Sequence, residues 1–222
     1  MTAKDVIRGR IRNALELAHR EVPELPRPLD TGPSPGTPSG LDDTESCVQR
    51  FREMLESVGG FCYLVRDEAE AQSVLARVAA ERSAERIAVS DQPFARRLAG
   101  SLTDHLIESD QRAALLEADI GVTTAQWAIA ETGTIVLESD SERNRLVSLL
   151  PPVHVAILDA SVILSTLGAL LSAVQRAKQG GPTPAITLIT GPSRTADIEL
   201  TLVVGVHGPR ELHVILLRTD LP

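Results

Sequence analysis

Short, almost entirely apolar runs recur along most of this chain and alternate with segments that have helical periodicity. The clearest run is Val-His-Val-Ala-Ile-Leu at 153–158, which leaves no polar face for solvent. Strands that bury both faces are typical of parallel sheets covered by helices, whereas a half-exposed antiparallel strand alternates apolar and polar residues. The pattern therefore predicts an α/β fold with a three-layer, largely parallel sheet.

The alternation begins after Leu41. A helix is expected through Val48 to Val58, where Gly59 and Gly60 end it before a strand. Further helices are expected at 67–80 and within 94–116. We expect strands at 61–65, 86–90, 119–122, 134–137, 153–158, 186–189, 200–204 and 212–217.

The first forty residues differ from the rest of the chain. Residues 4–20 place apolar side chains on one helical face, and residues 23–40 then hold six of the fourteen prolines. We therefore predict two parts. Residues 1–40 form an N-terminal amphipathic helix and a proline-rich arm, and residues 41–222 form one α/β domain.

Charge and composition argue against two classes of partner. The net charge of -8 opposes binding to nucleic acid or to an anionic membrane, and an aromatic content of 2% offers few rings for stacking bases. The longest uncharged run, 160–175, is shorter than the roughly 20 apolar residues that span a membrane. The first turn carries alternating charges and no apolar signal segment. We expect a cytoplasmic protein without a membrane span.

The two cysteines, Cys47 and Cys62, are not arranged as Cys-x-x-Cys. Alone they cannot supply the four thiolates that an iron–sulfur cluster usually needs, nor a structural zinc site. We expect buried free thiols, no metal site and no cofactor in this chain.

The segment 185–195 predicts a ligand loop. A β-branched strand leads into a turn whose Gly191, Ser193, Arg194 and Thr195 offer conformational freedom, hydroxyls, a guanidinium and a helix N-cap. Backbone N–H groups at a helix start attract anions, so the loop suits a small carboxylate or phosphate. The alternative interpretation is a capped strand-to-helix turn without a ligand.

Four segments of the chain occur in the same order in a known family. They are Ala-Glu-Thr-Gly-Thr at 130–134, Leu-Leu-Pro-Pro-Val-His at 149–154, Gly-Pro-Ser-Arg-Thr-Ala-Asp-Ile-Glu at 191–199 and Gly-Val-His-Gly-Pro at 205–209. Through them the chain resembles the LUD domain, as found in the lactate utilisation protein C family. The resemblance is close over 119–217 and general before that. It departs at Gln126, where many relatives carry an acidic residue.

The resemblance implies a NagB/RpiA/CoA-transferase-like fold and a part in oxidising L-lactate to pyruvate. It also implies iron–sulfur partner subunits, with this chain as the cluster-free accessory member. The chain's own residues show no dinucleotide-binding or Walker motif that would supply an electron carrier. Homo-oligomerisation stays open. An independent isomerase or acyl/CoA-transferase-like enzyme is the first alternative, and a non-catalytic scaffold is the second.

Ligands of open α/β sheets bind beyond the carboxyl ends of strands, so the loops that follow strands are candidate sites. Four loops qualify, and they are Thr123-Thr124, Glu138 to Ser141, Asp159, and Gly191 to Thr195. In the second loop, Ser139 and Glu142 also fit a helix-capping box. Glu131 is the candidate nucleophile or general base, and its structural alternative is a carboxylate that accepts backbone N–H bonds. The candidate ligand-binding residues are Thr123, Thr124, Thr132, Gly133, Arg143, Arg145, His154, Gly191, Ser193, Arg194, Thr195, Asp197 and His207. Ser193, His207 and Asp197 are a conceivable catalytic triad, but the chain lacks the Gly-x-Ser-x-Gly turn of many hydrolases, which argues against a hydrolase of that kind.

Overall fold

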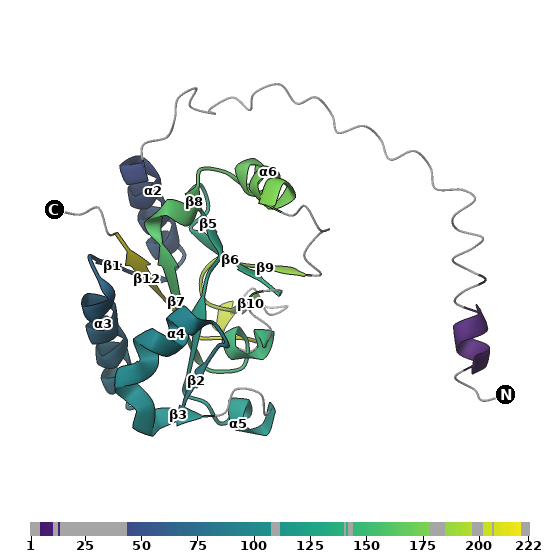
Figure 1. The fold of residues 1–222 in the computed structure, drawn as a ribbon, viewed down its shortest axis with the longest axis horizontal. Coiled ribbons are helices and arrows are strands. Elements are labelled where there is room, and N and C mark those ends of the chain that lie inside the picture. Colours follow the sequence, from purple (N-terminus) through teal and green to yellow (C-terminus); the bar gives the residue numbers. More distant parts are fainter. Residues whose placement is uncertain are drawn as a thin grey trace. The chain divides into compact units, whose positions relative to one another are not determined.

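The computed structural model describes residues 5–10, 13, 44–107, 112–139, 141, 144–177, 185–196, 202–205 and 207–218. The chain divides into two units, residues 1–41 and 42–222, so each is considered by itself. In the first unit, residues 5–10 are helical and exposed, within the helix expected at 4–20 (Figure 1). The expected proline-rich arm at 23–40 lies outside the described residues.

A six-stranded sheet in the order β1-β12-β7-β4-β2-β3 forms the centre of the second unit (Figure 1). Every neighbouring pair in this sheet is parallel. Its strands are β1 (Phe61–Val65), β2 (Ile87–Val89), β3 (Leu106–Ile107), β4 (Ile120–Thr124), β7 (Val153–Asp159) and β12 (Glu211–Leu217). The predicted α/β fold with a largely parallel sheet is confirmed.

Strand β7 lies in the middle of the sheet and shows why its sequence is apolar throughout. Val155 and Ile157 pack into the core on one face, together with α3 and α4. Ala156 and Leu158 pack into the core on the other face, together with α2. The helices are α2 (Thr44–Ser57), α3 (Glu68–Glu81), α4 (Pro93–Leu98), α5 (Arg112–Leu116) and α6 (Leu167–Ala177).

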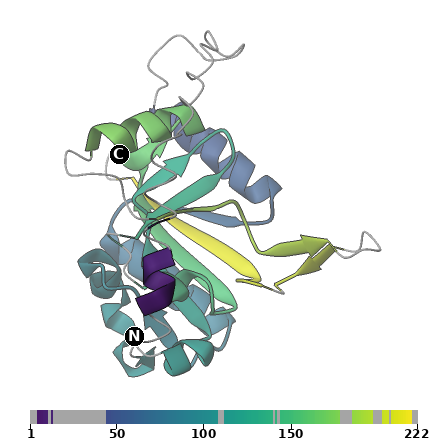
Figure 2. The same ribbon diagram turned by 90° about the vertical axis from the view of Figure 1, so that its right-hand side faces the viewer.

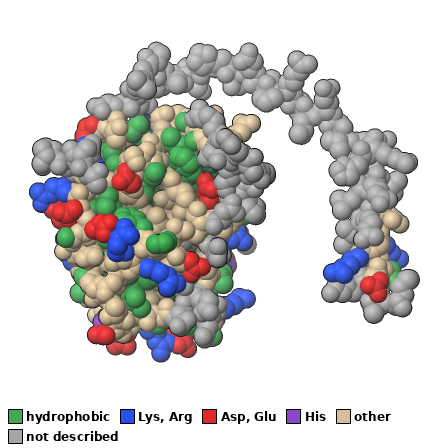
Figure 3. All heavy atoms as spheres, in the orientation of Figure 1, with side chains coloured by type: hydrophobic (Ala, Val, Ile, Leu, Met, Phe, Trp, Pro, Cys, Tyr) green, Lys and Arg blue, Asp and Glu red, His purple; other side chains and the backbone are tan. Residues whose placement is uncertain are grey.

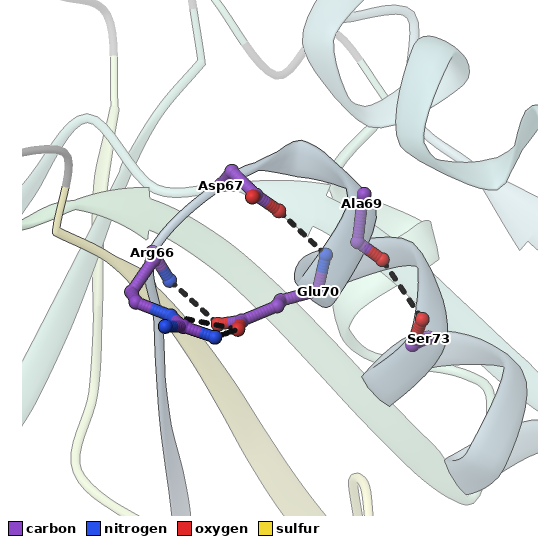
Figure 4. Close-up of polar contacts among 5 residues, drawn as sticks. All are labelled: Arg66, Asp67, Ala69, Glu70 and Ser73. Carbon is purple, nitrogen blue, oxygen red and sulfur yellow. Dashed lines mark hydrogen bonds and ion pairs between the residues drawn. The ribbon is translucent and has the colours of Figure 1, made fainter.

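Helix α3 begins where its sequence supplies a cap. The carboxylate of Asp67 accepts a hydrogen bond from the backbone N–H of Glu70 at 2.8 Å (Figure 4). Glu70 in turn pairs with Arg66, which precedes the helix. Such a cap satisfies an N–H group that has no partner inside the helix and contributes about 1 kcal/mol.

A second, four-stranded sheet in the order β8-β5-β6-β9 lies on the α2 face of the first (Figure 2). Its β6 pairs antiparallel with both β5 and β9, whereas β5 and β8 are parallel. The strands expected at 134–137 and 186–189 therefore lie in this second, mainly antiparallel sheet and not in the parallel one. The strands are β5 (Trp127–Ile129), β6 (Thr134–Glu138), β8 (Ile163–Leu164) and β9 (Ile186–Ile189).

After β9 the chain enters a hairpin instead of a helix. Strands β10 (Arg194–Ala196) and β11 (Leu202–Val204) pair antiparallel and project from the body of the domain (Figure 2). The helix N-cap expected at Gly191 to Thr195 is therefore wrong. Short polar turns precede helices and hairpin strands alike, and only the pairing with β11 distinguishes the two cases. Across the described residues, none of the helices has both the length and the apolar character to cross a bilayer.

Candidate functional site

The parallel sheet has a topological switch point between β2 and β4, which are neighbours in it. After β2 the chain enters α4, whose Ala95 and Leu98 pack on the α3 face. After β4 the chain passes to the opposite face, where Ala125 and Ala128 join the core around α2. Ligands of open α/β sheets bind in the crevice at such a point, outside the carboxyl ends of the strands.

A pocket of about 430 Å³ opens at this switch point. Thr124 ends β4 and Asp159 ends β7, so the pocket lies at the carboxyl edge of the parallel sheet. The second sheet contributes the ends of β5 and β6. The described lining residues are Gln92, Phe94, Thr124, Ala125, Gln126, Trp127, Glu138, Ser141, Asp159 and Val162.

Gln126 holds the two sheets together at the pocket wall. Its Nε2 donates to the carbonyl of Thr124 at 2.7 Å, and its Oε1 accepts from the N–H of Glu138 at 2.8 Å. Its own N–H donates to the carbonyl of Val136 at 3.0 Å. An acidic residue at this position would lack the Nε2 donor. Gln126 therefore has a structural role here that needs an amide.

The carboxylate of Glu138 is 6% exposed and accepts a hydrogen bond from the indole Nε1 of Trp127 at 2.7 Å. This bond fixes the orientation of the ring at the pocket. Asp159 is half-buried, and one of its oxygens accepts from the N–H of Ser161 at 2.8 Å. On the other side of the pocket, Gln92 donates through Nε2 to the carbonyl of Ser141.

Three of the four loops predicted to form the ligand crevice do meet at this pocket. Thr124, the loop after Glu138 and Asp159 all line it. Ser139, however, accepts a hydrogen bond from the N–H of Ala185 at 3.1 Å, and its proposed capping partner Glu142 lies outside the described residues. Gln92, Phe94 and Trp127 were not among the candidates from sequence. Trp127 is the only tryptophan of the chain and follows Gln126 directly, which is the signal that would have found it.

Thr123 in β4 and His154 in β7 are buried and do not line the pocket. His154 is fully buried, and its Nε2 lies 2.8 Å from the hydroxyl of Thr123. Burial disfavours the imidazolium and lowers the pKa of His154 to about 3. Its Nδ1 has no hydrogen-bond partner in the described part of the chain. His154 is therefore a neutral core histidine at physiological pH.

The loop from Gly191 to Thr195 lies at the opposite edge of the parallel sheet. The N–H of Ser193 donates to the carbonyl of Pro209, just before β12, at 2.8 Å. Arg194 is exposed and donates through a terminal guanidinium nitrogen to the carbonyl of Val58, just before β1. The expected position at the carboxyl ends is therefore wrong, because β9 runs in the antiparallel sheet. Whether this loop holds an anion stays a prediction.

Glu131 takes part in the start of α6. Its carboxylate accepts a hydrogen bond from the N–H of Leu167 at 3.1 Å, and its own N–H donates to the carbonyl of Ser165 at 3.1 Å. This contact matches the structural alternative considered for Glu131, since negative charge at a helix start is favourable. A catalytic role for Glu131 stays a prediction.

Of the other motif residues near Glu131, the threonines contact one another and Gly133 lies against α2. The hydroxyl of Thr134 lies 2.7 Å from that of Thr132 and 2.6 Å from that of Thr190. Gly133 has a φ of 62°, and a Cβ there would lie 2.7 Å from the Cα of Leu55 and closer still to its nitrogen. Gly133 is thus required because the backbone of α2 touches it.

The other candidates are surface residues or fall outside the description. Arg145 is exposed and follows Asn144, whose side chain caps a short 3-10 helix, Arg145–Ser148. His207 is also exposed. Arg143, Asp197 and the side chain of Thr195 lie outside the described residues.

The cysteines lie in or beside the α2 core. Cys47 is buried, and burial raises the pKa of the partly buried Cys62 to about 12. Neither cysteine forms a disulfide within the described residues. In the parts of the chain that the structure covers, no three His, Cys, Asp or Glu side chains gather in a way that could hold a metal ion.

Charged side chains of both signs are intermixed on the face shown in Figure 3. Several charged side chains of the described residues are paired; Arg97, for example, binds Glu68 at 2.9 Å, and Arg82 binds Glu211 at 2.8 Å. This face therefore offers acidic and basic groups side by side, unlike the basic surface that a nucleic-acid phosphate backbone needs.

Comparison with known proteins finds relatives that match part of this chain. The Lactate utilization protein C of Bacillus subtilis is 41% identical over 103 residues, 46% of this chain and 43% of that protein. An uncharacterised protein of Neisseria meningitidis is 42% identical over 102 residues, 46% of this chain and 43% of that protein. The match thus spans less than half the length of these relatives.

A solved structure and a family model cover more of the chain. The crystal structure of a DUF162 family protein from Deinococcus radiodurans has the same fold, with a TM-score of 0.58 and 22% identity, over 79% of this chain and 99% of that one. The model of the LUD domain family matches residues 48–217, which is most of the chain. This chain belongs to the LUD domain family.

Proposed function

We propose that this protein takes part in lactate utilisation as a cluster-free accessory subunit in the cytoplasm. The observation that carries the proposal is the LUD domain match over 48–217, together with relatives named Lactate utilization protein C at about 40% identity. Because the match covers less than half of each relative, the activity and partners of those proteins are part of the proposal. Iron–sulfur subunits would carry the electrons removed from lactate.

The chemistry of the cysteines supports the cluster-free role. The chain has two cysteines in all, whereas a cluster usually needs four thiolates. Cys62 has a raised pKa, so it is a thiol at neutral pH and a poor metal ligand. Electron transfer from lactate would then depend on a partner subunit.

A small carboxylate or phosphate ligand bound by the 191–195 loop is the finer part of the proposal. The exposed guanidinium of Arg194 uses one terminal nitrogen for the carbonyl of Val58 and keeps further N–H donors. Arg194→Lys would keep the positive charge but lose the planar fork, so calorimetry with L-lactate and inorganic phosphate tests this part. About tenfold weaker binding at unchanged stability is expected.

The alternative of an independent isomerase or transferase finds less support. It relies on Glu131, whose carboxylate accepts a hydrogen bond at the start of α6. Glu131→Gln keeps an oxygen for that bond. If the isolated chain turned over an acyl-CoA or a sugar phosphate, and Glu131→Gln abolished that turnover, the accessory role would be replaced by this one.

Gene deletion tests the role in lactate utilisation. A host strain that lacks this gene should lose growth on L-lactate but grow normally on pyruvate, and the wild-type gene should restore growth. Tagged protein from lactate-grown cells should co-purify with iron–sulfur subunits. Unimpaired growth of the deletion strain on L-lactate would contradict the proposal.

A further inference from the structure

The pocket at the β2/β4 switch point has a chemistry that the lactate proposal does not use. Its described lining includes the carboxylates of Glu138 and Asp159 and the rings of Phe94 and Trp127, and none of these lining residues is Lys, Arg or His. The loop containing Arg194 lies at the other edge of the sheet, beside the residues that precede β1 and β12. The pocket is therefore a separate candidate site.

Asp159 gives the pocket a negative charge that the described residues do not neutralise. One carboxylate oxygen accepts from the N–H of Ser161 at 2.8 Å, and no described residue donates to the other oxygen. Asp159 is half-buried, so a cation beside it would be screened less than at an exposed surface. The carbonyl oxygen of the Gln92 side chain adds a second acceptor, since the contact made by Gln92 uses its Nε2.

The aromatic rings favour the same kind of ligand. Trp127 donates its indole N–H to Glu138 at 2.7 Å, which holds the ring in place at the pocket. Tryptophan is the best aromatic partner for a cation, because the face of its ring is negative. The ring of Phe94 already has a cation of the chain beside it, since the guanidinium of Arg97 lies 5.2 Å from its centroid, so the proposed contact with a ligand cation is with Trp127.

We propose that this pocket binds a small organic cation that carries N–H donors, such as a protonated amine or a guanidinium compound. The N–H groups would donate to Asp159 and Gln92, and the charge would lie against Trp127. A small anion such as lactate would instead meet the like charge of the Asp159 carboxylate. A cavity of about 430 Å³ leaves room for a molecule of several carbon atoms.

The experiment uses the full chain and its single tryptophan. Because Trp127 lines the pocket, its fluorescence reports binding there, and calorimetry detects any binding that leaves the fluorescence unchanged. Agmatine and putrescine are the cationic probes, and L-lactate is the anionic comparison, all at matched ionic strength. The two cations should bind, and L-lactate should leave Trp127 fluorescence unchanged.

Two variants identify the carboxylate. Asp159→Asn removes the charge but keeps an oxygen that can cap Ser161, since Asn is as good a cap as Asp. Asp67→Asn is the matched control, because Asp67 caps α3 in the same way and does not line the pocket (Figure 4). Asp159→Asn should weaken binding of agmatine about tenfold or more, and Asp67→Asn should not.

Three results would overturn the proposal. The first is no response to either cation by fluorescence and calorimetry. The second is L-lactate binding at Trp127 as tightly as the cations. The third is unchanged agmatine affinity in Asp159→Asn, provided that the variant unfolds with the wild-type midpoint. If Asp159→Asn does not fold, Glu138→Gln replaces it, because it removes the other carboxylate of the pocket while the glutamine still offers an oxygen to the Trp127 indole. Unchanged agmatine affinity in Glu138→Gln would then overturn the proposal.

Discussion

Gly133→Ala should strongly destabilise the protein. Gly133 has a φ of 62°, a left-handed conformation that costs an alanine roughly 1–2 kcal/mol. The new Cβ would also lie 2.7 Å from both Leu55 Cα and the carbonyl carbon of Met54, which are backbone atoms of α2 and cannot rotate away. Overpacking of this kind costs about 1–3 kcal/mol more. The expected loss is therefore about 2–5 kcal/mol in the free energy of unfolding.

Urea denaturation followed by far-UV circular dichroism measures this loss. Gly168→Ala is the control, because it lies in α6 with the hydroxyl of Thr166 as its nearest neighbour at 3.7 Å and has no positive φ. It should unfold at the wild-type midpoint or slightly higher, since alanine favours helix. If Gly133→Ala unfolded at the wild-type midpoint too, the close approach of α2 to the Ala-Glu-Thr-Gly-Thr turn would be refuted.

Three further predictions concern single side chains. The pKa of His154 is lowered from 6.5 to about 3 in the folded protein, so the unfolded chain takes up this proton first as the pH falls. The contribution of His154 to the free energy of unfolding is therefore full above pH 6.5 and is lost toward pH 3, with a loss of about 2 kcal/mol at about pH 5. His154→Gln should flatten the dependence of the unfolding free energy on pH. The pKa of Cys62 is raised to about 12, so this thiol should react with iodoacetamide at neutral pH far more slowly than an exposed thiol does. Mass spectrometry would measure the rate, and a rate equal to that of an exposed thiol would contradict the burial of Cys62. Gln126→Glu should lose the hydrogen bond to the carbonyl of Thr124 and lower the unfolding free energy by roughly 1–3 kcal/mol, whereas an unchanged urea midpoint would show that this bond is dispensable.

The parallel sheet was predictable because its strands are buried on both faces. The apolar run of β7 is an example, with Val155 and Ala156 in different clusters. Strand β6 has the same pattern, because Ile135 packs toward α2 and Val136 toward α6, yet its neighbours are antiparallel. A run buried on both faces does not reveal the direction of its neighbours, so the antiparallel second sheet could not be deduced from it.

The candidate site was predictable only where it depends on strand ends. Thr124 and Asp159 follow from the positions of β4 and β7 in the sequence. Gln92 and Phe94 depend on β2 being the neighbour of β4, and strand order cannot be deduced from one sequence. Arg194 was placed at the wrong edge for the same reason, because its position depends on β9 pairing with β6.

Reconstitution of lactate oxidation from purified components tests the accessory role most directly. Pyruvate formed from L-lactate would be measured with this chain alone, with the iron–sulfur subunits alone, and with all of them together, using an artificial electron acceptor. The proposal predicts that the chain alone forms no pyruvate and that the complete set forms more than the iron–sulfur subunits without it. Pyruvate formation by the chain alone, or equal rates with and without it, would contradict the proposed function.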